Sequence, residues 1–229
     1  MLVYKYRSGN NKDLNALNEN KYWASNTEGL NDPCEGITDN KRIKWLLGKL
    51  GKWAGAESKE NYDLINDNTD EVLSLDKNLG IYSLTLTPLD ELLWAHYANK
   101  HEGFCIGYDS ELLTNEEKHV YSSNVIYSNS PAISTGLEYL FYDKEDIIKK
   151  TAFYKSKRWE YEKEFRIISN KLGYNFYQAN SLKSIHFGLR ISDEIKQNVL
   201  KILKGRSVDF FQIELEKDSY NFIAKRIII

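Results

Sequence analysis

Apolar and polar positions alternate in several short segments of the chain, and this two-residue period predicts β-strands. The predicted strands are residues 2–7, 22–25, 81–86, 103–108, 120–127, 164–169, 184–188, 208–215 and 221–229. In other segments apolar residues recur every three or four positions, as in helices that bury one face. The predicted helices are a short one around Leu14 and Leu17 and longer ones at residues 43–53, 87–100, 133–153 and 192–204.

Two of these helices have clear boundary signals. Thr87 precedes Pro88 and Asp90, which gives a capping residue, a proline at the first helical position and an acid in the first turn. Ser192 is a good N-cap for the last helix, and Gly205 follows its final turn. We therefore expect helices to begin near residues 87 and 192.

The order of the elements predicts an α+β fold, because strands and helices follow one another without a regular strand–helix–strand repeat. We expect a mixed, mostly antiparallel sheet with flanking helices. The chain has 229 residues and no proline-rich linker. It is long enough to bury a core of its own, so we expect a single compact domain over residues 1–229.

Composition narrows the class of protein further. Hydrophobic residues make up 41% of the chain, charged residues 28%, and the net charge is −2. These values exclude an intrinsically disordered chain and argue against a strongly basic nucleic-acid binder, although a local basic patch is compatible with them. Cys34 and Cys105 are too few for a disulfide framework. Without a long apolar run or a signal peptide, the chain is expected to be cytoplasmic, with no membrane partner.

The segment 155–166 concentrates acidic residues. Glu160, Glu162 and Glu164 occupy every second position, and Arg166 follows. In an extended strand the three carboxylates project from one face, where they raise each other's pKa unless a cation compensates. Such a cluster suits acid–base or oxocarbenium chemistry. A solvated strand whose acids are offset by Arg166 is the alternative.

The predicted helix 87–100 carries polar rings on its apolar stripe. Tyr97 and His101 continue the spacing of Leu89 and Leu93, and His96 lies beside them. The two histidines are five residues apart, whereas a metal-binding helical pair has a spacing of four. Both histidines are therefore also compatible with a purely structural role.

Two further motifs lie in the first 35 residues. Tyr4 and Tyr6 alternate with Lys5 and Arg7, so one strand offers cations for phosphate and rings for packing or stacking. An edge strand whose basic residues discourage aggregation is the alternative. The turn at residues 31–35 offers Asn31, Asp32 and Glu35 for a cation or a ribose hydroxyl; the same residues form ordinary turns. The chain lacks a P-loop, a GxGxxG turn and a GxSxG elbow.

Taken in order, these motifs resemble the bacterial domain-of-unknown-function 2971 family (DUF2971). The resemblance rests on a strand of the Y-K-Y-R type, an aromatic strand with a serine, and the motifs N-D-P-x-E, W-x-H-Y-A-x-x-H-x-G and K-x-x-x-W-x-Y-E-x-E-x-R. They correspond here to residues 4–7, 22–25, 31–35, 94–103 and 155–166.

The same order is also similar to that of compact ADP-ribosyltransferases, which implies an ADP-ribosyltransferase-like fold. It implies an enzyme that uses NAD as substrate and a macromolecular acceptor that the sequence does not identify, of the kind found among toxins and antiviral-defence effectors. Lys5 and Arg7 stand where those enzymes carry a histidine or arginine that contacts NAD. Ser25 stands where they carry a serine or tyrosine near the nicotinamide. Glu162 and Glu164 stand where they carry the catalytic glutamate.

This resemblance implies a role for each candidate residue. Glu164 is the expected catalytic carboxylate because it begins the apolar strand 164–169, and Glu162 is expected to orient it or the acceptor. His96 and Tyr97 complete the catalytic set. The residues expected to bind NAD are Lys5, Tyr6, Arg7, Ser25, Asn31, Asp32, Glu35, His101, Trp159 and Arg166. No metal ligand belongs to this interpretation.

Two other functions remain open at this point. A metal-dependent hydrolase or nuclease would use Asp32, Glu35, both histidines and the glutamate pair with Mg²⁺ or Mn²⁺. A sensor or interaction domain without catalysis would use the same motifs to stabilise its fold.

Overall fold

The computed structural model describes residues 1–32, 49, 79–114, 119–130 and 144–228. An eight-stranded sheet runs through these residues in the order β12-β11-β10-β4-β1-β3-β8-β5. Only β10 and β11 pair in parallel in this sheet, so the expected α+β class with a mixed, mostly antiparallel sheet is confirmed.

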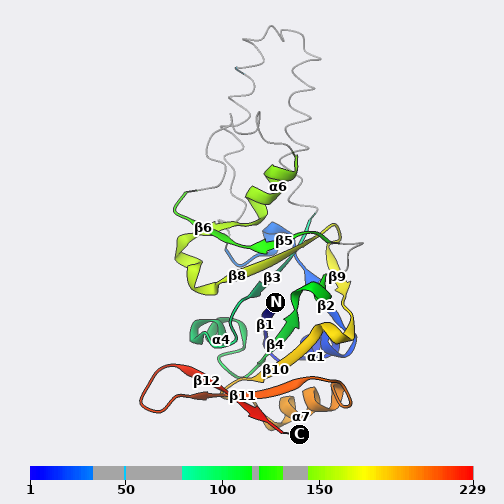
Figure 1. The fold of residues 1–229 in the computed structure, drawn as a ribbon, viewed down its shortest axis with the longest axis vertical. Coiled ribbons are helices and arrows are strands. Elements are labelled where there is room, and N and C mark those ends of the chain that lie inside the picture. The colour runs from blue at the N-terminus through cyan, green and yellow to red at the C-terminus, as the bar shows by residue number, and fades with distance from the viewer. Residues whose placement is uncertain (33–48, 50–78, 115–118, 131–143, 229) are drawn as a thin grey trace.

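The elements follow one another as a strand-rich chain with short helices (Figure 1). The strands of the large sheet are β1 (Leu2–Arg7), β3 (Gly80–Thr85), β4 (Phe104–Asp109), β5 (His119–Asn124), β8 (Glu164–Ser169), β10 (Leu182–Phe187), β11 (Asp209–Leu215) and β12 (Phe222–Ile227). Two small ribbons pair β2 (Lys21–Ala24) with β9 (Gly173–Phe176) and β6 (Ile126–Ser128) with β7 (Tyr154–Ser156). The helices are α1 (Asn11–Asn18), α4 (Glu91–Tyr97), α5 (Ser110–Leu113), α6 (Lys144–Ala152) and α7 (Asp193–Ile202), with 3₁₀ turns η1 (Thr27–Gly29), η4 (Lys157–Glu162) and η5 (Ala179–Ser181).

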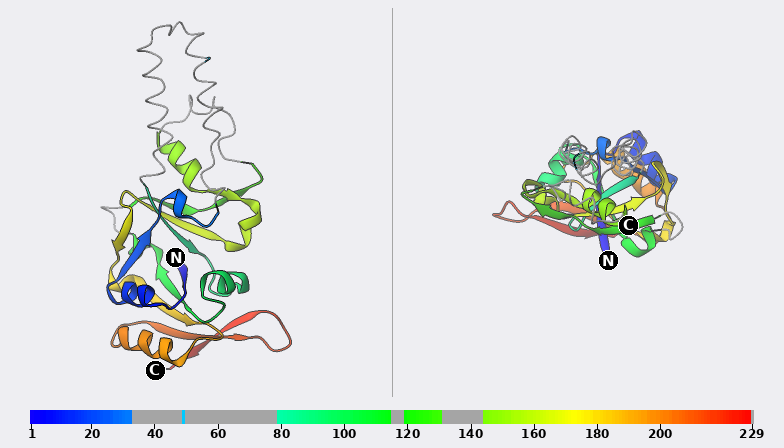
Figure 2. Two further views of the ribbon diagram at one scale, coloured as in Figure 1. Left: turned by 180° about the vertical axis from the view of Figure 1, so that it is seen from behind. Right: turned by 90° about the horizontal axis from the view of Figure 1, so that it is seen from above.

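Three apolar clusters hold the sheet. The largest includes Val3, Phe104, Ile106, Ile185 and Val199, and joins β1, β4 and β10 to α7. A second cluster lies around Trp94 of α4, and a third lies between β8 and α6. Figures 1 and 2 show α7 at the β12 end of the sheet and α6 at the β5 end.

The strand predictions are confirmed with shifts of a few residues at their ends, except that 120–127 divides into β5 and β6. The ribbon strands β7 and β9 were not predicted. Ser192 caps α7 as expected, because its hydroxyl accepts a hydrogen bond from the backbone N–H of Ile195. Apart from residue 49, the predicted helix 43–53 lies outside the described residues, as do residues 133–143; within the rest of the helix expected over 133–153, α6 covers Lys144–Ala152.

The prediction for the helix at 87–100 is wrong at both ends. The carboxylate of Asp90, not Thr87, caps α4 and accepts hydrogen bonds from the N–H groups of Leu92 and Leu93. The helix ends at Tyr97, and Asn99, Lys100 and His101 then adopt positive φ angles of 47°, 55° and 71°. Three consecutive left-handed residues end a right-handed helix, so His101 cannot continue the stripe of Leu89 and Leu93.

No helix among the described residues is long and apolar enough to span a membrane.

Candidate functional site

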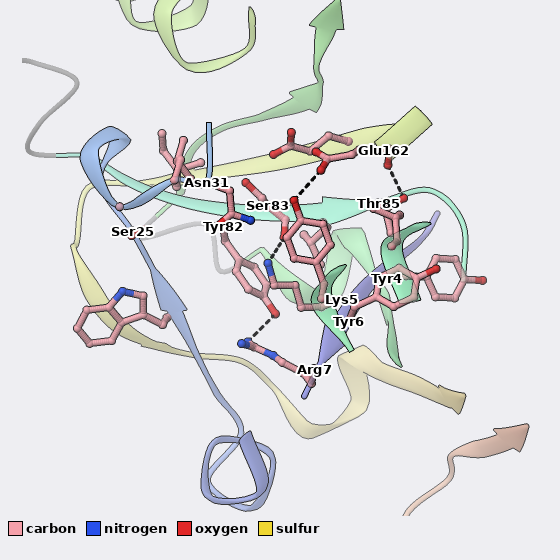
Figure 3. Close-up of a pocket in the computed structure, with 18 of the residues that line it drawn as sticks. Tyr4, Lys5, Tyr6, Arg7, Ser25, Asn31, Tyr82, Ser83, Thr85 and Glu162 are labelled. Atoms are coloured by element: carbon pink, nitrogen blue, oxygen red, sulfur yellow. Dashed lines mark hydrogen bonds between the residues drawn. The ribbon is translucent and has the colours of Figure 1, made fainter. Parts of the chain in front are cut away.

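The candidate site lies where β1 and β3 separate. These neighbouring strands share a single register pair, Tyr4 with Thr85, whereas β1 pairs with β4 along its whole length. A pocket of about 390 Å³ opens at this separation (Figure 3). Its lining comes from β1, α1, the segment from β2 to Asn31, β3, α4, β7, η4 and β8, so segments far apart in the sequence meet around it.

Cations from β1 form one wall of the pocket. Lys5 donates a hydrogen bond across the gap to the carbonyl of Ser83, with an Nζ–O distance of 2.7 Å. Burial, together with the charge of Arg7, lowers the pKa of Lys5 to about 8, although Glu164 and Glu162 act in the opposite direction. Among the described residues, the polar side-chain contacts of Arg7 are long, 3.5 Å to the Tyr82 hydroxyl and 3.7 Å to Asp13. This wall offers two cations to an anionic ligand.

Glu162 faces these cations from the opposite wall. Its Oε1 accepts a hydrogen bond from the Tyr97 hydroxyl at 2.7 Å, and its Oε2 lies 2.6 Å from Lys155 Nζ. Its backbone carbonyl accepts a hydrogen bond from the Thr85 hydroxyl at 2.6 Å. Burial and the bond to Glu162 raise the pKa of Tyr97, so this phenol stays protonated and donates. Glu162 is thus fixed at both its carboxylate and its backbone.

Glu164 is held more tightly, by a buried ion-pair network. Arg166 contacts it with two nitrogens, Nε to Oε1 at 2.8 Å and a terminal nitrogen to Oε2 at 3.0 Å. Lys155 Nζ lies 3.0 Å from the same Oε2. Burial alone would raise the pKa of Glu164, but the charges of Arg166 and Lys155 outweigh it and lower the pKa to about 2. Glu164 is therefore a carboxylate over the whole physiological range.

The chain bends between the two glutamates, so residues 160–164 do not form the extended strand in which the three carboxylates would share one face. Residues 157–162 form the 3₁₀ turn η4, and Lys163 has a left-handed conformation with φ of 43° before β8 begins. Glu160 is exposed on this turn and lies apart from the pocket lining. Glu162 and Glu164 nevertheless converge, because the bend directs both carboxylates to Lys155.

Comparison with known proteins gives one match. A family model described as a protein of unknown function (DUF2971) matches residues 93–167. The expected resemblance to DUF2971 is confirmed. No curated protein and no solved structure matches the chain. The DUF2971 segment supplies Tyr97, Lys155, Glu162 and Glu164 to the pocket, whereas the β1 cations come from outside it.

Eight of the predicted site residues meet at this pocket. They are Lys5, Tyr6, Arg7, Ser25, Asn31, Tyr97, Glu162 and Glu164. Five of them come from the first 31 residues of the chain, and the other three come from the DUF2971 segment. The roles assigned to them stay predictions.

Three other predicted residues lie next to this set without lining the pocket. Arg166 donates hydrogen bonds to the Glu164 carboxylate and to the carbonyl of Ala152. Trp159 lies against Lys155, with its ring centroid 5.1 Å from Nζ. Asp32 is buried beside the lining residue Asn31. Glu35 lies outside the described residues.

The two histidines are not brought into the pocket. His96 is exposed on α4, and its ring contact is with Tyr97 at 6.3 Å. His101 packs edge-on against Phe222 of β12, and burial together with Arg190 lowers its pKa. Among the described residues, no group of three His, Cys, Asp or Glu side chains could hold a metal ion.

Sequence reasoning missed Lys155 and Thr85 as site residues. Lys155 lies seven residues before Glu162, on β7, and only the turn η4 between them brings its ammonium to both glutamates. Thr85 lies at the end of β3, where it is the register partner of both Tyr4 and Glu164. The signal available for this network was the lysine that begins the motif at residues 155–166, close to a run of acids.

Proposed function

We propose that the pocket binds NAD and that the protein is an ADP-ribosyltransferase-like enzyme, which cleaves the bond between nicotinamide and ribose. The observation that carries the proposal is the meeting of Lys5, Ser25 and Glu162 in one pocket, at a point where two strands of the sheet separate. A pocket of about 390 Å³ with a few convergent polar groups is typical of a small-molecule site.

The two walls suit opposite ends of the dinucleotide. Lys5 and Arg7 present donors to the diphosphate, and the long contacts of Arg7 leave its planar fork able to turn toward an anion. Glu162 lies at the other wall, where positive charge would develop on the ribose carbon as nicotinamide leaves. The bond that breaks gives its electron pair to nicotinamide, and an acceptor oxygen or nitrogen bonds the ribose carbon and releases its proton.

Glu162 is a better candidate than Glu164 for the catalytic carboxylate, which exchanges the two roles expected from the sequence. Glu164 has both oxygens held by Arg166 and one of them also by Lys155. Glu162 has one oxygen on Lys155 and the other on the neutral hydroxyl of Tyr97, which a ribose hydroxyl can replace. In this proposal Arg166, Glu164 and Lys155 are positioning residues: Arg166 holds Glu164, Glu164 holds Lys155, and Lys155 holds Glu162.

The test compares nicotinamide release from NAD by the wild type and by Glu162→Gln. We expect the variant to release nicotinamide about 10²- to 10³-fold more slowly, the usual effect of removing one group that stabilises transition-state charge. Glu160→Gln is the matched control, because Glu160 is exposed on the same turn. We expect Glu160→Gln to release nicotinamide at the wild-type rate.

Two outcomes would contradict the proposal. Either no nicotinamide is released by folded wild-type protein with lysate as acceptor source, or Glu162→Gln releases it as fast as the wild type.

A role as a toxin or antiviral effector follows only from the similarity to ADP-ribosyltransferases and stays a prediction.

A further inference from the structure

The large sheet ends in two edge strands, β5 and β12, and only β5 is protected against pairing with a further strand. The register between β5 and β8 shifts between His119 and Tyr121, and Tyr121 packs against the cluster that joins β8 to α6. In contrast, β12 pairs with β11 in an unbroken register from Phe222 to Ile227 and contains no proline. Bulges, prolines and covering elements are the features that keep an edge strand from pairing.

Basic residues on an edge strand also discourage pairing, but those of β12 are balanced by acids of the same chain. Lys225 forms an ion pair with Glu214, and Arg226 forms one with Asp209. Both acids belong to β11, the neighbour of β12 in the sheet. The repulsion between two copies of β12 is therefore reduced.

The backbone of β12 offers hydrogen-bonding groups along its free side. The N–H of Glu216 donates to the carbonyl of Asn221, so these opposite residues form a bonded pair. Bonded and non-bonded pairs alternate along an antiparallel ladder, so Phe222, Ala224 and Arg226 direct their N–H and C=O groups away from β11. Among the described strands, only β11 pairs with β12. The outward groups thus form an open site for one more strand.

The sequence of β12 complements itself in one antiparallel register. A two-fold axis perpendicular to the sheet pairs residues that lie on the same face, so the register is centred on a single residue. Centring on Lys225 would place two lysines directly opposite each other, which is destabilising. Centring on Ala224 places Lys225 opposite Ile223 and Arg226 opposite Phe222 of the second copy, so no cation faces another cation.

The register centred on Ala224 also covers the most exposed large apolar side chains among the described residues. Tyr220 is 94% exposed and Ile228 is 96% exposed, beyond the two ends of β12. In this register Tyr220 of one copy approaches Ile228 of the other. A cavity of about 620 Å³ opens beside Ile228, with Leu203 and Phe210 in its lining. Figures 1 and 2 show the turn between β11 and β12, which carries Tyr220, extending beyond the rest of the sheet.

We propose that β12 pairs with β12 of a second copy of this chain, antiparallel and centred on Ala224, so that two eight-stranded sheets become one. Each copy then places its Tyr220 at the cavity beside Ile228 of the other copy. The interface is isologous, because the same residues serve both copies. It lies at the β12 end of the sheet and takes no residue from the lining of the candidate site.

Sedimentation equilibrium, from low to high micromolar concentration, tests the pairing. We expect the wild type to have twice the mass of one chain and Ala224→Pro to have the mass of one chain. The proline removes an N–H that points away from β11, so it blocks the second copy and leaves the ladder with β11 intact. Tyr220→Ala should raise the dimer dissociation constant about tenfold. Leu172→Ala, at an exposed apolar position before β9, is the matched control and should leave the constant unchanged.

Disulfide cross-linking tests the register, in a chain that carries Cys34→Ser and keeps the buried Cys105. Ala224→Cys places two thiols directly opposite, at a Cα separation of about 5.5 Å that suits a disulfide, so we expect a covalent dimer on oxidation. Lys225→Cys is the matched control. The register separates its two equivalent residues by a further two positions along the strands, beyond the reach of a disulfide.

Three results would overturn the proposal. They are a wild type with the mass of one chain at every concentration, a folded Ala224→Pro that still dimerises, and cross-linking of Lys225→Cys without cross-linking of Ala224→Cys. If the proline variant does not fold, Tyr220→Ala and the cross-linking pair decide the question. Nicotinamide release is no part of these measurements, so their outcome leaves the proposed function untouched.

Discussion

Glu162 and Glu164 each place one carboxylate oxygen on the same ammonium, with distances of 2.6 and 3.0 Å to Lys155 Nζ. All three side chains are at least nine-tenths buried. Two adjacent buried carboxylates repel strongly, so the shared cation is a condition for both to be charged. Arg166 balances the second negative charge.

Replacing the shared cation should therefore destabilise the fold. We expect Lys155→Met to lower the free energy of unfolding by about 3–5 kcal/mol, because it leaves a buried charge without its partner. Urea denaturation at neutral pH measures the change. Lys157→Met, at an exposed position on η4, is expected to stay within about 0.5 kcal/mol of the wild type. Equal stability of the two variants would show that the network does not depend on Lys155.

The low pKa of Glu164 predicts a loss of stability in acid. Its pKa falls from the ordinary 4.5 to about 2 on folding, so its contribution is complete above pH 4.5 and disappears as pH falls toward 2. The contribution is about 3 kcal/mol, from the free energy that corresponds to one pKa unit. Denaturation between pH 5 and 2 measures it, and Glu164→Gln should flatten that part of the profile. An unchanged slope in the variant would assign the acid sensitivity to other groups.

The pKa of Lys5 predicts that the affinity of the pocket for an anion falls as pH rises. Its pKa of about 8 keeps it charged at neutral pH and neutral at pH 9. We expect the dissociation constant for ADP-ribose to rise about tenfold between pH 7 and pH 9, because only the protonated amine attracts the diphosphate. Calorimetric titrations at the two pH values give the ratio. Lys5→Arg stays charged and should remove the dependence; a dependence that persists in this variant would exclude Lys5 as its source.

Removing the N-cap of α4 should lower the stability of the fold by less than removing Lys155 does. Asp90 accepts two N–H groups at the start of the helix that carries Tyr97 to the pocket. Asp90→Ala should cost about 1 kcal/mol in thermal unfolding. Glu91→Ala, on the exposed side of the same turn, leaves the cap intact and serves as control. A cost as large in the control would mean that first-turn charge, rather than capping, stabilises α4.

Much of the sheet could be predicted from the sequence because alternation is a local signal. Residues 2–7 and 164–169 were predicted as strands and form β1 and β8. In β8, Phe165 and Ile167 join the main core while Glu164 and Arg166 face the ion-pair network, as alternation requires. The helix at 87–100 was extended too far because its apolar stripe continues past the point where positive φ angles end it.

The site could be predicted only in part, because its assembly depends on long-range contacts. The cations of β1 and the glutamates were recognised as separate motifs, and only the separation of β1 from β3 places them in one pocket. His96 and His101 are residue types expected of a site, but His96 is exposed on α4 and His101 lies beyond the end of that helix, against Phe222. Lys155 begins one of the motifs but was assigned no role, because only the turn η4 brings the glutamates back to it.

The most direct test of the central claim is proton NMR of NAD incubated with the wild type and with Glu162→Gln. The account predicts that free nicotinamide signals grow with the wild type and stay near the uncatalysed level with the variant, while both proteins bind NAD with similar affinity. Equal nicotinamide formation by both proteins would contradict the role of Glu162, and the absence of both binding and cleavage in the wild type would contradict the NAD pocket itself.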